Sequence, residues 1–297
     1  MLEFQEIKIE DKIWMDPILR QSGLMGYDGA FGTRFIWSGA YHSKYCKYQD
    51  YLIFASGKDK LSYSFPLGQG DLGGTIQAML QDAEKRGNPF SIRGLTAEQK
   101  DELEQACPET FEFWSDRDSA DYIYLSQDLI QLAGRKFHSK RNHLSKFARM
   151  YDFTYEEVTA QNLGECEKIA REWCSQNGNC GENGLDKETC ALKKSFTFFD
   201  ALKFSGGLIR IDGKPVAFTI GEEINERAFL LHFEKALSGY DGLYAAINHE
   251  FACHSLENYE YVNREEDMGL EGLRKAKLSY YPAIILERFG ARLKGCD

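Results

Sequence analysis

The sequence predicts a mixed α+β protein made of two similar halves, and three observations indicate this. The chain has 297 residues, which is enough for one large domain or two of modest size. Segments with the alternation typical of strands occur between segments with helical periodicity along the whole chain. The order of these segments in the second half recurs, less regularly, in the first. We therefore expect tandem domains at residues 1–133 and 151–297, joined by a basic helix at 134–150.

Local signals predict a hairpin and three helices in the first half. The turn-forming Gly57-Lys58-Asp59 separates two short apolar segments, which is typical of a β-hairpin. Apolar residues recur at helical spacing after Asp71, and Thr96 with Gln99 forms the capping-box pattern that begins another helix. In order, the expected elements are a helix at 10–20, strands at 51–55 and 61–67, a helix at 71–87, a strand at 90–92, a helix from 96 and a strand at 122–125.

The second half shows a clearer succession of elements. Asp212-Gly213 is a strong signal for a tight hairpin between two strands. In order, we expect a strand at 153–158, helices at 161–176 and 186–203, strands at 206–212, 214–223 and 228–235, a helix at 241–256, a strand at 259–263, a helix at 270–278 and a strand at 283–286. This order, with a three-stranded meander after two helices, is that of the GNAT acyltransferase fold. Two such domains in tandem are therefore the predicted architecture.

Composition excludes several classes of protein and sets an expectation for location. The formal net charge of -10 argues against a general nucleic-acid coat, because such a coat binds phosphates through excess Lys and Arg. Mean hydropathy is -0.47, and no apolar run approaches the ~20 residues that span a bilayer. The first residues carry no secretory signal pattern, so we expect a cytoplasmic protein. The eight cysteines follow no zinc-site spacing, so no metal is expected.

Two blocks of sequence resemble one bacterial family. The first block runs from Asp121 to Leu125 and continues from Gly134 to Phe147, and the second runs from Asn263 to Pro282. The family consists of proteins of unknown function that are similar to the C-terminal catalytic domain of phosphatidylglycerol lysyltransferase. The resemblance implies a tandem GNAT arrangement, shared with Fem-type peptidoglycan aminoacyltransferases. It also implies transfer of an aminoacyl group from aminoacyl-tRNA to an amine or a lipid hydroxyl, although this sequence lacks the multi-span membrane portion of the lipid-modifying enzymes.

The basic segment between the halves is a candidate phosphate-binding surface. Six Lys or Arg residues and two His lie between Arg135 and Arg149 in an otherwise acidic chain. On a helix, three of the basic residues flank one side of an apolar seam (Lys136, Lys140 and His143) and three the other (His138, Arg141 and Arg149). With Asn142, this segment is expected to bind a tRNA acceptor stem or the pyrophosphate of CoA. The alternative is a solvated linker helix whose charges pair with acidic residues of the second half.

A second candidate donor site is the turn between the meander and the following helix. In the GNAT fold this turn presents backbone N–H groups at a helix N-terminus, which suit a phosphate. Gly239 and Gly242 are the expected contacts. The usual acyl-CoA pattern is absent, because Ala236 stands three residues before Gly239, where Gln or Arg is expected. The missing pattern counts against acyl-CoA and leaves open aminoacyl-tRNA, the donor that the family resemblance implies. An ordinary strand-to-helix turn is the alternative.

Three residues are candidates for the chemistry of transfer. His232 and Glu234 lie two apart on the presumed central strand, so they are expected to face the same cleft, where one would act as general base. Tyr280, at the end of a later helix, is expected to protonate the leaving group. The alternative for the first two is a polar pair on a half-solvated strand.

Four further residues in the second block are candidates for binding the acceptor: Asn263, Arg264, Asp267 and Lys277. The planar guanidinium of Arg264 suits a carboxylate or a phosphate. The alternative is structural, with Arg264 paired to a nearby acid and the acidic residues capping the helix that follows Gly269.

The sequence therefore predicts a soluble acyl- or aminoacyltransferase that needs no cofactor. Its donor is aminoacyl-tRNA, with acyl-CoA as the second choice, and its acceptor is a small molecule or a peptide. A backbone oxyanion site near the meander turn would assist the attack. The alternative from a different class is a non-catalytic module whose degenerate GNAT domains bind tRNA or a nucleotide.

Overall fold

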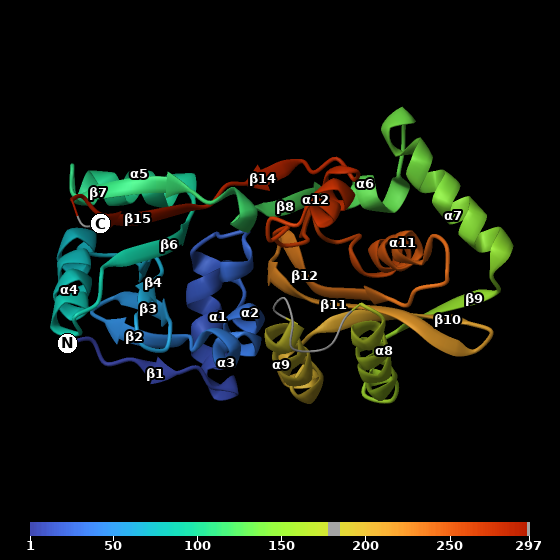
Figure 1. Cartoon of the computed structure of the whole chain (residues 1–297), viewed down its shortest axis with the longest axis horizontal. Coiled ribbons are helices and arrows are strands. Elements are labelled where there is room, and N and C mark those ends of the chain that lie inside the picture. The colour runs from blue at the N-terminus through green and yellow to red at the C-terminus, as the bar shows by residue number, and fades with distance from the viewer. Residues whose placement is uncertain (178–184, 296–297) are drawn as a thin grey trace.

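The protein contains two β-sheets that lie side by side, each covered by helices (Figure 1). The computed structural model describes residues 1–177 and 185–295. The first sheet has eight strands in the order β1-β2-β3-β4-β6-β15-β7, with β5 paired to β3. The second has seven strands in the order β14-β8-β13-β12-β11-β10-β9. The described residues therefore form the mixed α/β architecture that the element order predicts.

The strands of the first sheet are β1 (Gln5–Glu6), β2 (Lys44–Tyr48), β3 (Tyr51–Ser56), β4 (Ser62–Tyr63), β5 (Leu67–Gly68), β6 (Ser91–Leu95), β7 (Phe111–Ser115) and β15 (Phe289–Leu293). Its helices are α1 (Lys12–Gln21), α2 (Phe31–Ile36), α3 (Ser38–Tyr41), α4 (Leu72–Lys85) and α5 (Ala97–Ala106). The predicted capping box forms at the start of α5, where the Thr96 hydroxyl accepts the Gln99 N–H and the Gln99 amide accepts the Thr96 N–H.

The strands of the second sheet are β8 (Asp121–Leu125), β9 (Phe153–Glu157), β10 (Ser205–Ile211), β11 (Lys214–Asn225), β12 (Ala228–Ala236), β13 (Tyr261–Asn263) and β14 (Ile284–Leu286). Its helices are α6 (Ser126–Gln131), α7 (His138–Met150), α8 (Leu163–Gln176), α9 (Leu185–Thr197), α10 (Phe199–Leu202), α11 (Leu243–Ser255) and α12 (Glu271–Leu278). Helices α8 and α9 cover one face of the sheet, and α11 packs on the other (Figure 1). Among residues 1–177 and 185–295, no helix is long and apolar enough to cross a membrane.

The two sheets exchange strands across the domain boundaries expected from the sequence. Strand β8 precedes the expected boundary at residue 133, yet it pairs with β13 and β14 in the second sheet. Strand β15 comes last in the chain, yet it lies between β6 and β7 in the first sheet. Apolar alternation identifies a strand but not its partner, and for this reason the linear division at 133 and 151 does not follow the sheets.

Arg288, directly before β15, forms ion pairs and a hydrogen bond that connect the two sheets. Its side chain is fully buried, and Nη2 lies 2.8 Å from Asp28 Oδ1 and 2.7 Å from Asp121 Oδ2. Nη1 donates to the carbonyl oxygen of Gly94 at 3.0 Å. Asp28 and Gly94 belong to the first half and Asp121 to β8, so one guanidinium joins both sheets. The two carboxylates and the carbonyl oxygen accept hydrogen bonds from this guanidinium, which offsets part of the cost of burying its charge.

Candidate active site

A β-bulge in β12 determines where the candidate site lies. Leu231 pairs with Gly221, and Phe233 pairs with the adjacent Ile220, so His232 is an extra residue on β12. Leu231 consequently packs with the core that α11 covers, whereas Phe233 packs with the core under α8 and α9. His232 and Glu234 therefore project from opposite faces of the sheet. The expectation that both face one cleft is wrong, because it assumes unbroken alternation.

His232 is enclosed between two carboxylates. Its Nε2 lies 2.9 Å from Glu222 Oε1 and its Nδ1 lies 3.1 Å from Glu265 Oε1, and its side chain has no exposed surface. Burial opposes the imidazolium, but the hydrogen bonds and charges of Glu222 and Glu265 outweigh it and raise the pKa of His232 to about 9. Both ring nitrogens are engaged, so this His is a buried cation rather than an accessible base.

Glu222 extends this cluster into the first half of the chain. Its carboxylate accepts the backbone N–H of Gly32 at 3.1 Å and of Thr33 at 3.2 Å. These groups lie in the first turn of α2, where N–H donors lack partners within the helix. The His232 cluster therefore joins the second sheet to α2.

Glu234, on the other face, forms a second cluster with Arg264 and Asn248. Its Oε1 accepts from Arg264 Nη2 at 2.9 Å, and its Oε2 accepts from Asn248 Nδ2 of α11 at 3.2 Å. The parallel pairing of β12 with β13 ends at Leu230 and Asn263. Glu234 and Arg264 both follow the last pair, so their ion pair lies where these strands part. Arg264 Nη1 is buried and has no hydrogen-bond partner among the described residues.

Tyr280 and Lys140 complete this second cluster. The Arg264 guanidinium lies 5.1 Å from the centre of the Tyr280 ring, and Lys140 Nζ lies 3.6 Å from that centre. Lys140 Nζ also donates to Ser279 Oγ at 2.7 Å. Burial, reinforced by the Arg264 cation, lowers the pKa of Lys140 to about 8, against the opposing effect of Glu234. Burial raises the pKa of Tyr280 to about 12, so its hydroxyl stays protonated and can donate.

A basic cavity of about 450 Å³ lies between α7 and α12, and Lys140 belongs both to it and to the cluster around Glu234. It is lined by Lys136, Ser139, Lys140, His143, Gly272, Lys275, Ala276, Ser279 and Tyr281. None of these described lining residues is acidic, although Asp128 forms an ion pair with Lys136 at 2.8 Å. Hydroxyl, imidazole and ammonium donors in one concave site suit a phosphate.

A second cavity, of about 370 Å³, lies far along the first sheet beside β1 and β2 and is lined by Gln5, Glu6, Lys8, Asp11 and Tyr45. Glu6 and Asp11 place negative charge in its lining. It has no contact with the cluster around Glu234, so we do not associate it with the same chemistry.

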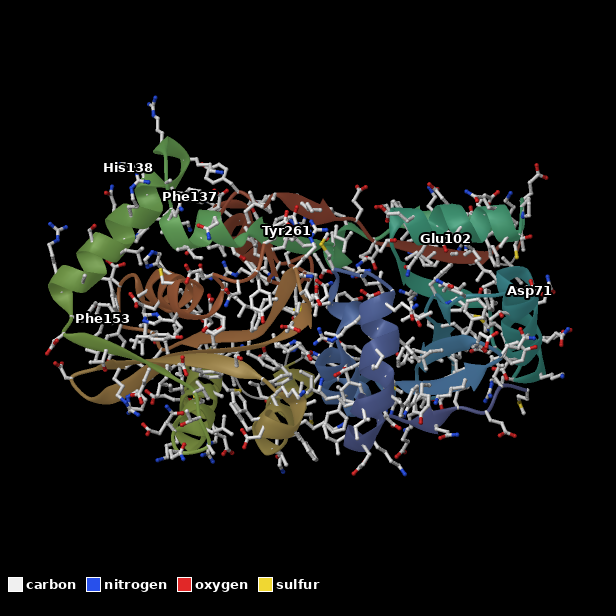
Figure 2. All side chains as sticks on the ribbon, turned by 180° about the vertical axis from the view of Figure 1, so that it is seen from behind. Asp71, Glu102, Phe137, His138, Phe153 and Tyr261 are labelled. Carbon is white, nitrogen blue, oxygen red and sulfur yellow. The ribbon has the colours of Figure 1, made fainter. Side chains whose placement is uncertain are left out.

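The basic segment divides between this cavity and the rest of the surface. Lys136, Lys140 and His143 line the cavity, on one face of the segment, as the helical spacing predicts. Arg141 instead donates to the carbonyl oxygens of Leu132 and Gly134, so it ends α6. Asn142 and His138 bond to each other at 3.2 Å, and His138 lies at the outer end of α7, opposite the end of the molecule that holds Asp71 and Glu102 (Figure 2).

At the turn that contains Gly239 and Gly242, Gly242 packs against α7. A Cβ on Gly242 would lie 3.2 Å from the His143 carbonyl oxygen and 3.3 Å from Phe147 Cβ. The Asp241 N–H already donates to the Tyr151 hydroxyl at 3.1 Å. Helix α7 thus occupies the space beside the start of α11, where the sequence interpretation places a phosphate. The structure provides no support for a donor site at this turn.

Of the four residues expected to bind the acceptor, three hold the loop after β13. Asn263 accepts from the Glu265 N–H and donates to the Met25 carbonyl. Asp267 accepts from Arg274 and Tyr122. Lys277 donates to the carbonyl oxygens of Arg264, Glu265 and Glu266. Their polar groups are satisfied and buried. Arg264 pairs with Glu234, as the structural alternative expects, but its Nη1 lacks a partner among the described residues, so it remains at the candidate site.

Sequence reasoning missed Asn248 and Lys275, and it noted Ser279 beside Tyr280 without assigning it a role. Asn248 is a polar residue on an otherwise apolar face of α11, and it is 3% exposed. Lys275 and Ser279 are four residues apart, so they share a face of the helix at 270–278 with Gly272. Both patterns are visible in the sequence, but only the fold shows which neighbours these faces meet.

Comparison with known proteins identifies the family. The family described as phosphatidylglycerol lysyltransferase, C-terminal, matches residues 20–292. The chain belongs to this family. A curated relative, an uncharacterised protein of Mycoplasmoides gallisepticum, is 24% identical over 183 residues, which are 58% of this chain and 55% of that protein. The chain thus spans about half the length of that relative.

Solved structures agree with this assignment to the phosphatidylglycerol lysyltransferase C-terminal family. A conserved protein of unknown function from Bacteroides thetaiotaomicron VPI-5482 is 40% identical, with a TM-score of 0.94 over 99% of this chain and 100% of that one. L-PGS from Bacillus licheniformis is 15% identical, with a TM-score of 0.69 over 97% and 93% of the two chains. A tandem GNAT protein from the clavulanic acid biosynthesis pathway is 10% identical, with a TM-score of 0.52 over both whole chains. The predicted tandem GNAT-like fold is confirmed.

Proposed function

We propose that the protein transfers an aminoacyl group from aminoacyl-tRNA to a small-molecule or peptide acceptor in the cytoplasm. One observation carries the proposal. The basic cavity between α7 and α12 meets the cluster of Glu234, Arg264 and Tyr280 at Lys140. Phosphates of the tRNA acceptor stem would occupy the cavity, and the ester that links the amino acid to tRNA would lie beside the cluster.

The packing of α7 favours aminoacyl-tRNA over acyl-CoA as the donor. An acyl-CoA pyrophosphate would bind at the start of α11, but α7 packs there against Gly242. The cationic groups gather instead at the cavity that the basic face of α7 forms with α12. The family description, which names a lysyltransferase, agrees with an aminoacyl donor.

The residues of the cluster suit transfer from an ester. Arg264 Nη1 is a buried donor that has no partner among residues 1–177 and 185–295, and an unmet donor of this kind costs roughly 1–3 kcal/mol. A carbonyl oxygen of the donor beside it would remove that cost and be polarised for attack. Glu234 holds the guanidinium in place, and the protonated Tyr280 hydroxyl would donate a hydrogen bond to the departing ribose oxygen.

Binding of charged tRNA tests the proposal. We expect total aminoacyl-tRNA to bind with an affinity that falls as salt rises, because phosphate contacts release counterions. The double variant Lys136→Ala with Lys275→Ala should bind about tenfold more weakly and show a smaller salt slope. Lys58→Ala with Lys60→Ala, exposed in the first half, is the matched control.

Transfer of a radiolabelled amino acid from tRNA to a mixture of small-molecule and peptide acceptors tests the chemistry. Arg264→Met should abolish transfer and leave tRNA affinity within threefold. Binding without transfer in the wild-type chain would identify a non-catalytic module instead. Stabilisation by CoA esters with no effect of charged tRNA would identify the acyl-CoA alternative.

A further inference from the structure

We infer that Lys140 is the general base of transfer, the group that takes the proton from the attacking acceptor. This inference rests on the proposed function and deepens it, because it assigns a catalytic role within the same site. Lys140 is the residue that belongs to both the basic cavity and the cluster of Glu234, Arg264 and Tyr280. Its Nζ thus lies where the donor's phosphates and its ester meet.

The other titratable groups of the cluster around Glu234 are engaged or keep their proton, which leaves His143 of the cavity as the rival to Lys140. His232 faces the opposite side of the sheet and has both nitrogens between carboxylates. Both oxygens of Glu234 accept hydrogen bonds, from Arg264 and from Asn248. The Tyr280 hydroxyl keeps its proton, since burial raises its pKa. Lys140 donates to Ser279 and retains room toward the cavity.

The surroundings of Lys140 favour its neutral form. Burial and the nearby cation of Arg264, in the loop after β13, disfavour the ammonium of Lys140. Lys275 of α12, and Lys136 and His143 of its own segment, are the other basic side chains that line the cavity. Glu234 of β12 and the face of the Tyr280 ring attract the ammonium and act in the other direction. Burial and Arg264 prevail, which lowers the pKa of Lys140 to about 8. A fraction of this amine is therefore unprotonated near neutral pH.

The step balances without any further reactant. The lone pair of neutral Lys140 takes the proton of the acceptor's amine or hydroxyl as that heteroatom attacks the ester carbonyl. A bond forms between the heteroatom and the acyl carbon, and the bond from that carbon to the ribose oxygen of tRNA breaks. The Lys140 ammonium then gives its proton to the ribose oxygen, to which Tyr280 donates a hydrogen bond. The products are the aminoacylated acceptor and free tRNA.

Lys140→Arg separates this role from phosphate binding. Arginine keeps the positive charge but does not give up its proton in proteins. We expect the affinity for tRNA to change less than threefold and kcat to fall at least 100-fold, within the usual range for loss of a general base. Lys146→Arg is the matched control, because Lys146 lies on the same helix and pairs with Asp241. This variant should keep the wild-type tRNA affinity and the wild-type kcat. In the wild-type chain, kcat/KM should rise with pH through an apparent pKa near 8, and this rise should be absent in Lys140→Arg.

Competitive acetylation followed by mass spectrometry tests Lys140 without any need for transfer. We expect Lys140 to be labelled at a lower pH than the exposed Lys58. Labelling of the two in step overturns the inference, as does a Lys140→Arg chain that transfers at the wild-type rate. If the rise of kcat/KM with pH is absent in His143→Gln, and Lys140→Arg is still active, the base is His143 and not Lys140. Absence of transfer by the wild-type chain overturns the proposed function itself, so the two failures are distinguishable.

Discussion

At the scale of single residues, the environment of a side chain decides its chemistry more than its type does. His232 has the residue type of a general base, but two carboxylates and complete burial make it a structural cation. Lys140 has the residue type of a phosphate ligand, but burial and Arg264 favour its neutral amine. Sequence reasoning selected both residues but not these surroundings, because charge and burial come from segments distant in the chain.

Substitution of His232 should produce a stability loss that depends on pH. The pKa of His232 is about 9 in the folded protein against 6.5 for a free side chain, so folding binds this proton more tightly. Its stabilising contribution is fully present below about pH 6.5 and is lost as the pH rises through about 9. We expect His232→Ala to cost roughly 3–5 kcal/mol at pH 6, because it leaves two buried carboxylates without their cation. Urea unfolding at a series of pH values measures this.

The comparison at high pH provides the control for His232. The difference between wild type and His232→Ala should shrink as the pH passes 9. A difference that stays constant from pH 6 to 10 would contradict the ion-pair interpretation and indicate loss of packing alone.

At the scale of elements, the position of α7 decides which groups lie beside the start of α11 and which face α12. The helix packs through Phe147 against the start of α11 and turns Lys140 and His143 toward α12. Its contact with Gly242 needs a residue without a Cβ, since Gly242 has φ of 86° and lies close to the His143 carbonyl. The spacing predicted the seam of apolar residues on this helix, but it did not predict that the seam packs against α11.

Gly242→Ala should therefore destabilise the protein more than Gly239→Ala. Both glycines have positive φ, of 86° and 94°, so alanine costs about 1–2 kcal/mol at either from backbone strain. A Cβ at Gly239 meets open space, whereas a Cβ at Gly242 crowds α7, which adds roughly 1–3 kcal/mol. Thermal and urea unfolding of the two variants measure the difference. Equal losses would show that α7 does not pack tightly at this turn.

At the scale of the whole molecule, the last strand of the chain belongs to the first sheet. Strand β15 lies between β6 and β7, and Ala291 within it is fully buried in the first core. Arg288, just before this strand, joins Asp28 to Asp121. The two halves are therefore linked by strand exchange and by buried charge, and the candidate site lies in the second sheet beyond these links.

Removal of Phe289–Asp297 should weaken the first sheet rather than the second. Hydrogen exchange should lose protection in β6 and β7, which both pair with β15, and keep it in β11. Ala291→Asp, which buries a carboxylate in the first core, provides a full-length version of the test and should cost several kcal/mol. Earlier loss of protection in β11 than in β6 would contradict this arrangement.

The sequence by itself determined most of the helices and strands of the second half, the capping box at Thr96 and the basic face of Lys136, Lys140 and His143, and its element order indicated the tandem GNAT-like fold. These features depend on local spacing, which a single chain displays directly. Tertiary structure alone decided the exchange of β8 and β15, the bulge that separates His232 from Glu234, and the cavity that α12 forms with α7. Each depends on which distant segments meet, because strand pairing, burial and electrostatic fields arise only when those segments pack together.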